Sequence, residues 1–149
     1  MEFKLFLIKE FQRLKDEENK RKNLDWDIKR NLVKINYKIH TDAIKNHLIP
    51  EKISKDEESL IYATEADILN LALFGVTAQE WRTKNPELKG NLRDYADVSQ
   101  LVCLSNLENL NALFIKEGIT KSGRLEKLNS IAIEQMIILT QRKKLISFD

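Results

Sequence analysis

The sequence predicts an all-α protein, an irregular bundle of five to seven helices with an N-terminal helical arm. Apolar residues recur at spacings of three and four along most of the chain, which is the helix period. Only two Pro and four Gly occur in 149 residues, and no alternating run of β-branched or aromatic residues predicts a strand. With 42% apolar and 32% charged residues, the chain is expected to be globular, and its length permits one domain with a core.

The first helix is expected from about residue 3, because Phe3, Leu7, Phe11 and Leu14 recur at spacings of four, four and three. No Ser, Thr, Asp or Asn stands before it as an N-cap, so its natural start is expected upstream. Residues 15–22 are all polar, but three acidic residues each precede a basic residue by four positions. This order stabilises a helix and favours a continuous exposed helix over a linker.

A second helix is expected to begin at Asp25, as its cap, and to end near His47, since Pro50 disfavours helical geometry in the residue before it. A third helix is predicted over Asp56–Phe74, with Gly75 as its C-terminal stop.

Three further helices are predicted in the second half of the chain. Thr77 and Glu80 match a capping box for a short helix. A long helix is expected over Tyr95–Glu117, and the last begins at Thr120 or Ser122. The expected buried faces of the third and last helices comprise Leu60, Ile61, Ile68, Leu69, Ala72 and Leu73, and Leu125, Leu128, Ile131, Ala132, Met136, Ile137 and Leu139.

Composition narrows the cellular setting. Cys103 is the only cysteine, which excludes an internal disulfide, and its apolar neighbours predict a small core residue. The lack of a cysteine framework indicates a reducing compartment, so a cytoplasmic location is expected. Lys4 and Lys9 interrupt the opening apolar run, which argues against a signal peptide. No run of about 18 apolar residues is present, so no membrane span is expected.

Metal and cofactor sites are not predicted. The two histidines, His40 and His47, share a helix face but lie about 10 Å apart along the axis, so they are expected to be surface or half-buried residues rather than joint ligands. The chain has no C-x-x-C, no Gly-rich phosphate loop and no G-x-S-x-G. We therefore expect no cofactor and no catalytic residues.

An enzyme remains the weaker alternative, and it requires a pocket. Glu65 and Asp67 are two positions apart and point to different sides of a helix, so a paired-carboxylate catalyst would need a partner from elsewhere. This alternative predicts that both carboxyl groups converge with Arg93 and Tyr95.

Two segments are candidates for binding. The loop at the entry of the long helix carries Asn91, Arg93, Asp94 and Tyr95; it is either a binding loop for an acidic group or a tied helix start, and we favour the helix start. The first helix is rich in basic residues that could contact phosphates, although interleaved acidic residues favour a solvated face. These candidates for nucleic-acid contact are Lys4, Lys9, Arg13, Lys20, Arg21 and Lys22.

With these strings in view, the chain resembles bacterial and phage-type KilA-N domain proteins over nearly its whole length. Residues 2–14 resemble the closing helix of the KilA-N domain, a phage-associated DNA-binding module. The strings that resemble the helical region after that domain are Tyr62–Asp67, Thr77–Arg82, Gly90–Ala96 and Leu104–Glu108, and the last helix also fits.

The resemblance implies a division into residues 1–23, the closing helix and exposed arm, and residues 24–149, a helical accessory domain. It implies DNA binding by the parent protein, although the body of the KilA-N domain is absent from this chain. The expected function is a non-enzymatic accessory or oligomerisation region in phage or mobile-element regulation; the alternative is a stand-alone protein-interaction module. A homodimer is expected through Phe3, Leu7, Phe11 and Leu14.

Overall fold

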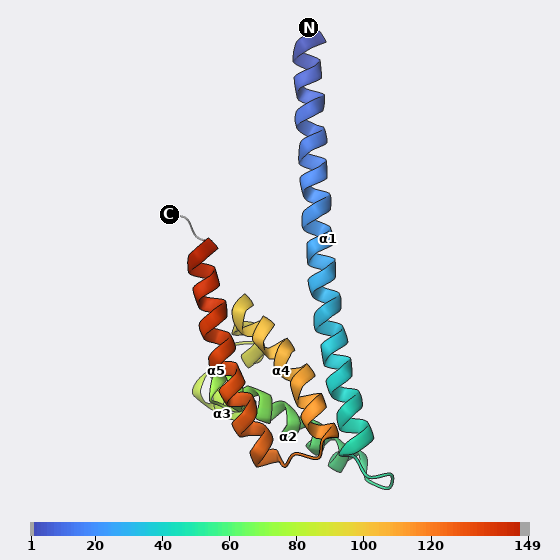
Figure 1. Cartoon of the computed structure of the whole chain (residues 1–149), viewed down its shortest axis with the longest axis vertical. Helices are drawn as coiled ribbons and strands as arrows, with labels where there is room; N and C mark the ends of the chain where they lie inside the picture. The colour runs from blue at the N-terminus through green and yellow to red at the C-terminus, as the bar shows by residue number, and fades with distance from the viewer. Residues whose placement is uncertain (1, 147–149) are drawn as a thin grey trace. The chain divides into compact units, whose positions relative to one another are not determined.

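The computed structural model describes residues 2–146, with side chains described for residues 7–23, 27 and 30–141. The described residues form five α-helices, one 3-10 helix and no strand, so the all-α prediction is confirmed (Figure 1). The elements are α1 (Glu2–His47), α2 (Lys55–Phe74), α3 (Ala78–Lys84), η1 (Leu92–Tyr95), α4 (Val98–Lys116) and α5 (Lys121–Ile146).

The contacts divide the chain into two compact units, residues 1–35 and residues 36–149. The first unit contains only residues of α1, and the second contains the end of α1 together with the other helices. The assignment of residues 1–23 to a separate domain stays a prediction.

The prediction that a new helix begins at Asp25 is wrong, because α1 is assigned as one helix from Glu2 to His47. No Pro or Gly occurs before Pro50, so nothing in this stretch opposes helical geometry. The polar stretch is helical, as expected, and carries ion pairs along its surface. Arg13 lies 3.0 Å from Glu17, and Lys22 lies 3.2 Å from Glu18.

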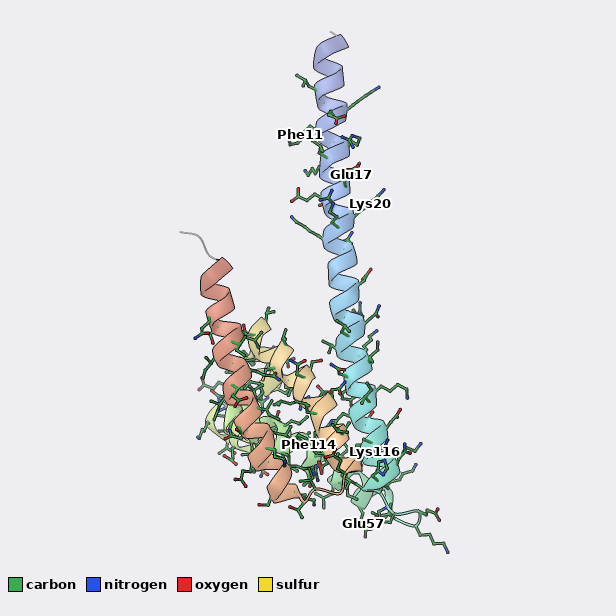
Figure 2. All side chains as sticks on the ribbon, in the orientation of Figure 1. Phe11, Glu17, Lys20, Glu57, Phe114 and Lys116 are labelled. Carbon is green, nitrogen blue, oxygen red and sulfur yellow. The ribbon has the colours of Figure 1, made fainter. Side chains whose placement is uncertain are left out.

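A single helix cannot bury its own apolar side chains, so the first unit has no core. Leu7, Phe11 and Leu14 are 53%, 71% and 53% exposed, and Leu32 and Ile35 are each 54% exposed. Figure 2 shows Phe11 projecting from α1. The first unit therefore presents large apolar groups to solvent, which monomeric proteins seldom do over a continuous stripe.

The core of the second unit lies among α2, α4 and α5, which pack against one another (Figure 1). Polar side chains tie the same helices: the Asn129 amide donates to the Ala72 carbonyl at 2.9 Å, and the Asn106 amide donates to Gln135 Oε1 at 3.1 Å. Cys103 is buried here, as expected. The core residues are Ile68, Leu69, Ala72, Cys103, Leu104, Leu107, Leu128 and Ala132.

Helix ends follow local capping chemistry. The Ser54 side chain accepts the Glu57 N–H, and Gly75 ends α2 in the left-handed region at φ 76°. The predicted start of the long helix at Tyr95 is wrong, because Asp97 caps α4 in a reciprocal capping box with Gln100.

The start of α3 matches the predicted cap only in part. The Thr77 hydroxyl accepts the Glu80 N–H at 3.1 Å, but it also donates to the Glu80 carboxylate. At the start of α5 the Thr120 hydroxyl accepts the Gly123 N–H at 3.2 Å, which selects Thr120 over Ser122.

Three burial expectations are wrong. Leu60 is 66% exposed and Ile137 is 53% exposed. Ile137 lies five positions after the buried Ala132, which rotates it about 140° away from the core-facing side of α5. His40, expected at the surface or half-buried, is only 4% exposed, because a set of buried polar partners receives it.

No single helix in residues 2–146 is both long and apolar enough to cross a membrane. α2 and α3, bent by 63° at their break, meet that criterion only when taken together.

Candidate functional site: a buried polar network

Four polar side chains from four helices meet inside the second unit. They are His40 of α1, Glu65 of α2, Asn111 of α4 and Arg124 of α5, and none is more than 4% exposed. Buried polar groups are costly unless they are paired, so their mutual contacts decide whether the bundle tolerates them. Together they make a network that joins the end of α1 to the core helices.

The Arg124 guanidinium organises this network. Its Nη2 donates to Glu65 Oε1 at 2.8 Å, and its Nη1 donates to Glu65 Oε2, giving a two-bonded ion pair. Nη1 also donates to Asn111 Oδ1 at 3.1 Å, and Nε donates to the Ile119 carbonyl at 3.1 Å. The guanidinium therefore links α5 to α2, to α4 and to the loop before α5.

The Asn111 amide connects the ion pair to His40. Its Oδ1 accepts from Arg124, so its Nδ2 is the donor toward His40 Nε2 at 2.8 Å. His40 Nε2 must then be an unprotonated acceptor, which fixes a neutral ring with the proton on Nδ1. Burial, opposed by the charge of Glu65 and aided by those of Arg93 and Arg124, lowers the His40 pKa to about 4, which agrees with a neutral ring.

Glu108 on α4 is a second buried acid with different surroundings. It is 4% exposed, and its Oε2 has no hydrogen-bond partner among the described residues. Burial raises the pKa of Glu108 to about 7, and the positive charge of Arg93 opposes this shift. Arg93 itself donates from Nε to Asn70 Oδ1 at 3.3 Å. Glu108 is thus balanced between its neutral and charged forms near neutral pH.

The end of α1 is held to α4 by a further polar contact. The Asn36 amide donates to the Ser105 hydroxyl at 2.7 Å, and the Asn109 amide donates to Asn36 Oδ1 at 3.1 Å. Together with the buried side chains of His40 and Ile44, these bonds hold residues 36–47 against the other helices of the second unit.

The polar groups of this network already hydrogen-bond one another, which limits the reactions or ligands they could serve. Within the described residues, no three His, Cys, Asp or Glu side chains gather as metal ligands. The carboxylate of Glu65 is engaged by Arg124, and burial raises the pKa of the Cys103 thiol, which keeps it protonated. The arrangement is therefore suited to holding helices together.

The four residues named for an enzyme occupy different surroundings. Glu65 is fully buried against Arg124, whereas Tyr95 is half-exposed and its hydroxyl donates to the Lys89 carbonyl at 2.6 Å. Asp67 is partly exposed, and Arg93 bonds Asn70. Glu65 and Arg93 act on the pKa of His40 in opposite directions: the charge of Glu65 raises it and the charge of Arg93 lowers it.

The candidate binding loop uses its polar groups internally. Asn91 Oδ1 accepts the Arg93 N–H at 3.0 Å, and Asp94 Oδ2 accepts the Asn91 N–H at 2.8 Å, which forms a capping box for η1. Gly90 is required here, since its φ is +86° and an added Cβ would lie 2.5 Å from Asp94 Oδ2. The Tyr95 ring lies 5.4 Å from the Trp81 ring, centroid to centroid.

The basic candidates lie on the first unit. The side chains of Lys9, Arg13, Lys20, Arg21 and Lys22 are exposed; Arg13 pairs with Glu10 and Glu17, and Lys22 with Glu18. In Figure 2, Glu17 and Lys20 lie on the same stretch of α1 as Phe11. The side chains of Lys4 and Phe3 lie outside the described residues.

Sequence reasoning missed most of the network. Its signal is a polar residue at helical spacing from core residues: Glu65 precedes Ile68 and Leu69 by three and four positions, and Arg124 precedes Leu128 by four. Spacing alone indicates which polar residue shares the core face, but not which residue on another helix will pair with it.

Comparison with known proteins gives no match: neither a family model nor a curated protein nor a solved structure is significantly similar to this chain.

Replacing Arg124 by Met should destabilise the fold by about 3–5 kcal/mol, because Glu65 would be left buried and unpaired. Glu65→Leu/Arg124→Met should recover at least half of that loss by removing both charges. Lys121→Met, at an exposed site in the first turn of α5, should change the free energy of unfolding by no more than about 0.5 kcal/mol. Urea unfolding measures all three, and a loss below about 1 kcal/mol for Arg124→Met would contradict the assigned role.

Glu108 should make stability fall as pH rises. Its folded pKa of about 7 lies above its ordinary value of 4.5, so the folded state binds more protons between these values and loses that advantage at higher pH. The free energy of unfolding of the wild type minus that of Glu108→Gln should fall by about 2 kcal/mol from pH 5 to pH 8. Urea unfolding at both pH values measures it, with exposed Glu57→Gln as the control. An unchanged difference would contradict a protonated Glu108.

Proposed function

We propose that this chain is a non-enzymatic helical accessory region that self-associates, and that it serves a KilA-N-type DNA-binding protein of a phage or mobile element. The observation that carries the self-association is the exposed apolar stripe of the first unit, Leu7, Phe11 and Leu14. The proposed DNA-binding context is supported by the family resemblance and by the exposed basic side chains on the same helix.

Self-association is the favoured explanation of the stripe because leaving its large apolar side chains in contact with water is unfavourable. A phenylalanine that is 71% exposed retains most of its unfavourable contact with water, and burying such a side chain stabilises an assembly by about 1.5–3 kcal/mol. Three such groups on one helix face lie in the first unit, where no second element covers them.

The buried network supports the accessory role of the second unit. Its polar groups connect four helices and are engaged in hydrogen bonds between them. The second unit is therefore proposed as a rigid platform for partner contact or regulation.

Light scattering on the purified chain tests self-association. The wild type is expected to run as an assembly with at least twice the 17.4 kDa chain mass, and Phe11→Asp should give a monomer with unchanged helical content. Asn19→Asp, an exposed polar position of α1, is the matched control and should assemble like the wild type. A monomeric wild type at high micromolar concentration would reject the proposal.

A salt titration of duplex DNA binding tests the nucleic-acid role. If the basic side chains of α1 contact phosphates, affinity should fall steeply as salt rises, and Lys9→Gln/Lys20→Gln should reduce the slope of log affinity against log salt by about 2. No binding at low salt would remove the DNA role from this chain and leave a protein-interaction module.

A further inference from the structure

We infer that α1 pairs with α1 of a second copy as a parallel, in-register, two-stranded coiled coil. This inference rests on the proposed self-association and specifies its partner, orientation and register. It is carried by three features of residues 7–35, all within the first unit: a heptad-spaced stripe, its exposure, and the signs of the charges beside it.

The stripe follows a heptad repeat through four consecutive heptads, from residue 7 to residue 35. In this repeat the a positions are 11, 18, 25 and 32, and the d positions are 7, 14, 21, 28 and 35. Six of these nine positions are apolar, namely Leu7, Phe11, Leu14, Ile28, Leu32 and Ile35. Alternating steps of three and four are what keep a seam facing a partner helix along its length.

The described apolar members of the seam are all more than half exposed, from 53% at Leu7 and Leu14 to 71% at Phe11. At the end of α1, the helix instead turns His40 and Ile44 into the bundle. The described apolar positions of the seam are thus exposed surface of the first unit, and an identical helix has the matching period.

The flanking charges select a parallel arrangement. Three of the four e positions carry Lys15, Lys22 and Lys29, and two g positions carry Glu10 and Glu17. In a parallel pair each g residue faces the e residue five positions later on the other helix, so Glu10 meets Lys15 and Glu17 meets Lys22 of the second copy. In an antiparallel pair e faces e, which sets lysine against lysine.

Existing pairs within the helix do not prevent these contacts. Glu10 and Glu17 both contact Arg13, and all three side chains are about half exposed. Such surface pairs are worth little individually, so each carboxylate can keep or exchange its partner when a lysine of the second copy approaches.

Three charged seam positions fix the register. Glu18, Arg21 and Asp25 alternate in sign at the centre of the stripe. In register, each shares its layer with the same residue of the second copy, and the single positive layer, Arg21, lies between two acidic layers. A shift of one heptad would instead place Phe11 against Glu18. Polar seam residues reduce stability but specify register, and here they confine the apolar layers to matching partners.

Disulfide trapping tests orientation and register directly. In a Cys103→Ala background, Leu14→Cys should form a covalent dimer on mild oxidation, because parallel in-register helices place identical d positions face to face. An antiparallel pair centred on the stripe would hold these cysteines roughly 21 Å apart. Asp16→Cys, on the outer face of the same helix, is the matched control and should remain uncrosslinked.

A charge exchange gives a second, independent readout. Lys15→Glu should weaken the dimer about three- to tenfold by replacing attraction with repulsion at two symmetric sites, and Glu10→Lys/Lys15→Glu should restore it. In an antiparallel pair centred on the stripe, Lys15 would face Lys22 or Lys29 of the second copy, so the single change would replace repulsion with attraction and strengthen the dimer. Analytical ultracentrifugation of the full chain measures each dissociation constant.

The outcomes separate this inference from the broader proposal. A monomeric wild type overturns both. A dimer in which Leu14→Cys fails to crosslink, or which Lys15→Glu fails to weaken, overturns only the parallel register. An assembly with three or more copies overturns the two-stranded arrangement while leaving self-association intact.

Discussion

The second unit depends on one ion pair, the two-bonded contact between Arg124 and Glu65 in the middle of the helices. Neither charge reaches solvent, so each is tolerated only because the other is present. The pair therefore restricts how the helices can pack: α5 must lie against α2 in the register that brings the guanidinium to the carboxylate. Apolar contacts among Leu69, Leu107 and Leu128 supply the driving force, and they would accept several alternative alignments.

Asn111 links the ion pair to α4 and to the end of α1. It accepts from Arg124 and donates toward His40, so one amide transmits the position of the ion pair to the end of α1. Since a neutral amide is used in both directions, the network needs no further charge. Hydrogen bonding of this kind favours one packing over others more than it adds to total stability.

The sequence predicted the helical class and most helix positions, but it did not predict the network. Helical spacing and Gly75 placed helix ends correctly because those signals are local, whereas the sequence does not decide between Thr120 and Ser122 for the start of the last helix. The helix start predicted at Asp25 was wrong because a possible cap residue does not interrupt a helix whose neighbouring residues also favour helical geometry. The start predicted at Tyr95 was wrong because Asp97 caps the helix two residues later. The pairing of Glu65 with Arg124, 59 positions apart, has no local signal, since it depends on how α2 and α5 cross.

Two other buried ionisable groups of the second unit, His40 and Glu108, respond to pH in opposite senses. His40, whose folded pKa of about 4 lies below its ordinary 6.5, weakens the fold as the solution becomes more acidic. Glu108, at about 7, weakens it as the solution becomes more alkaline. Their titration ranges overlap between about pH 4.5 and 6.5, where the two slopes offset each other. The second unit thus holds two buried groups whose linked contributions cancel: their joint contribution to stability is nearly independent of pH in mild acid, although either group alone would make it depend on pH.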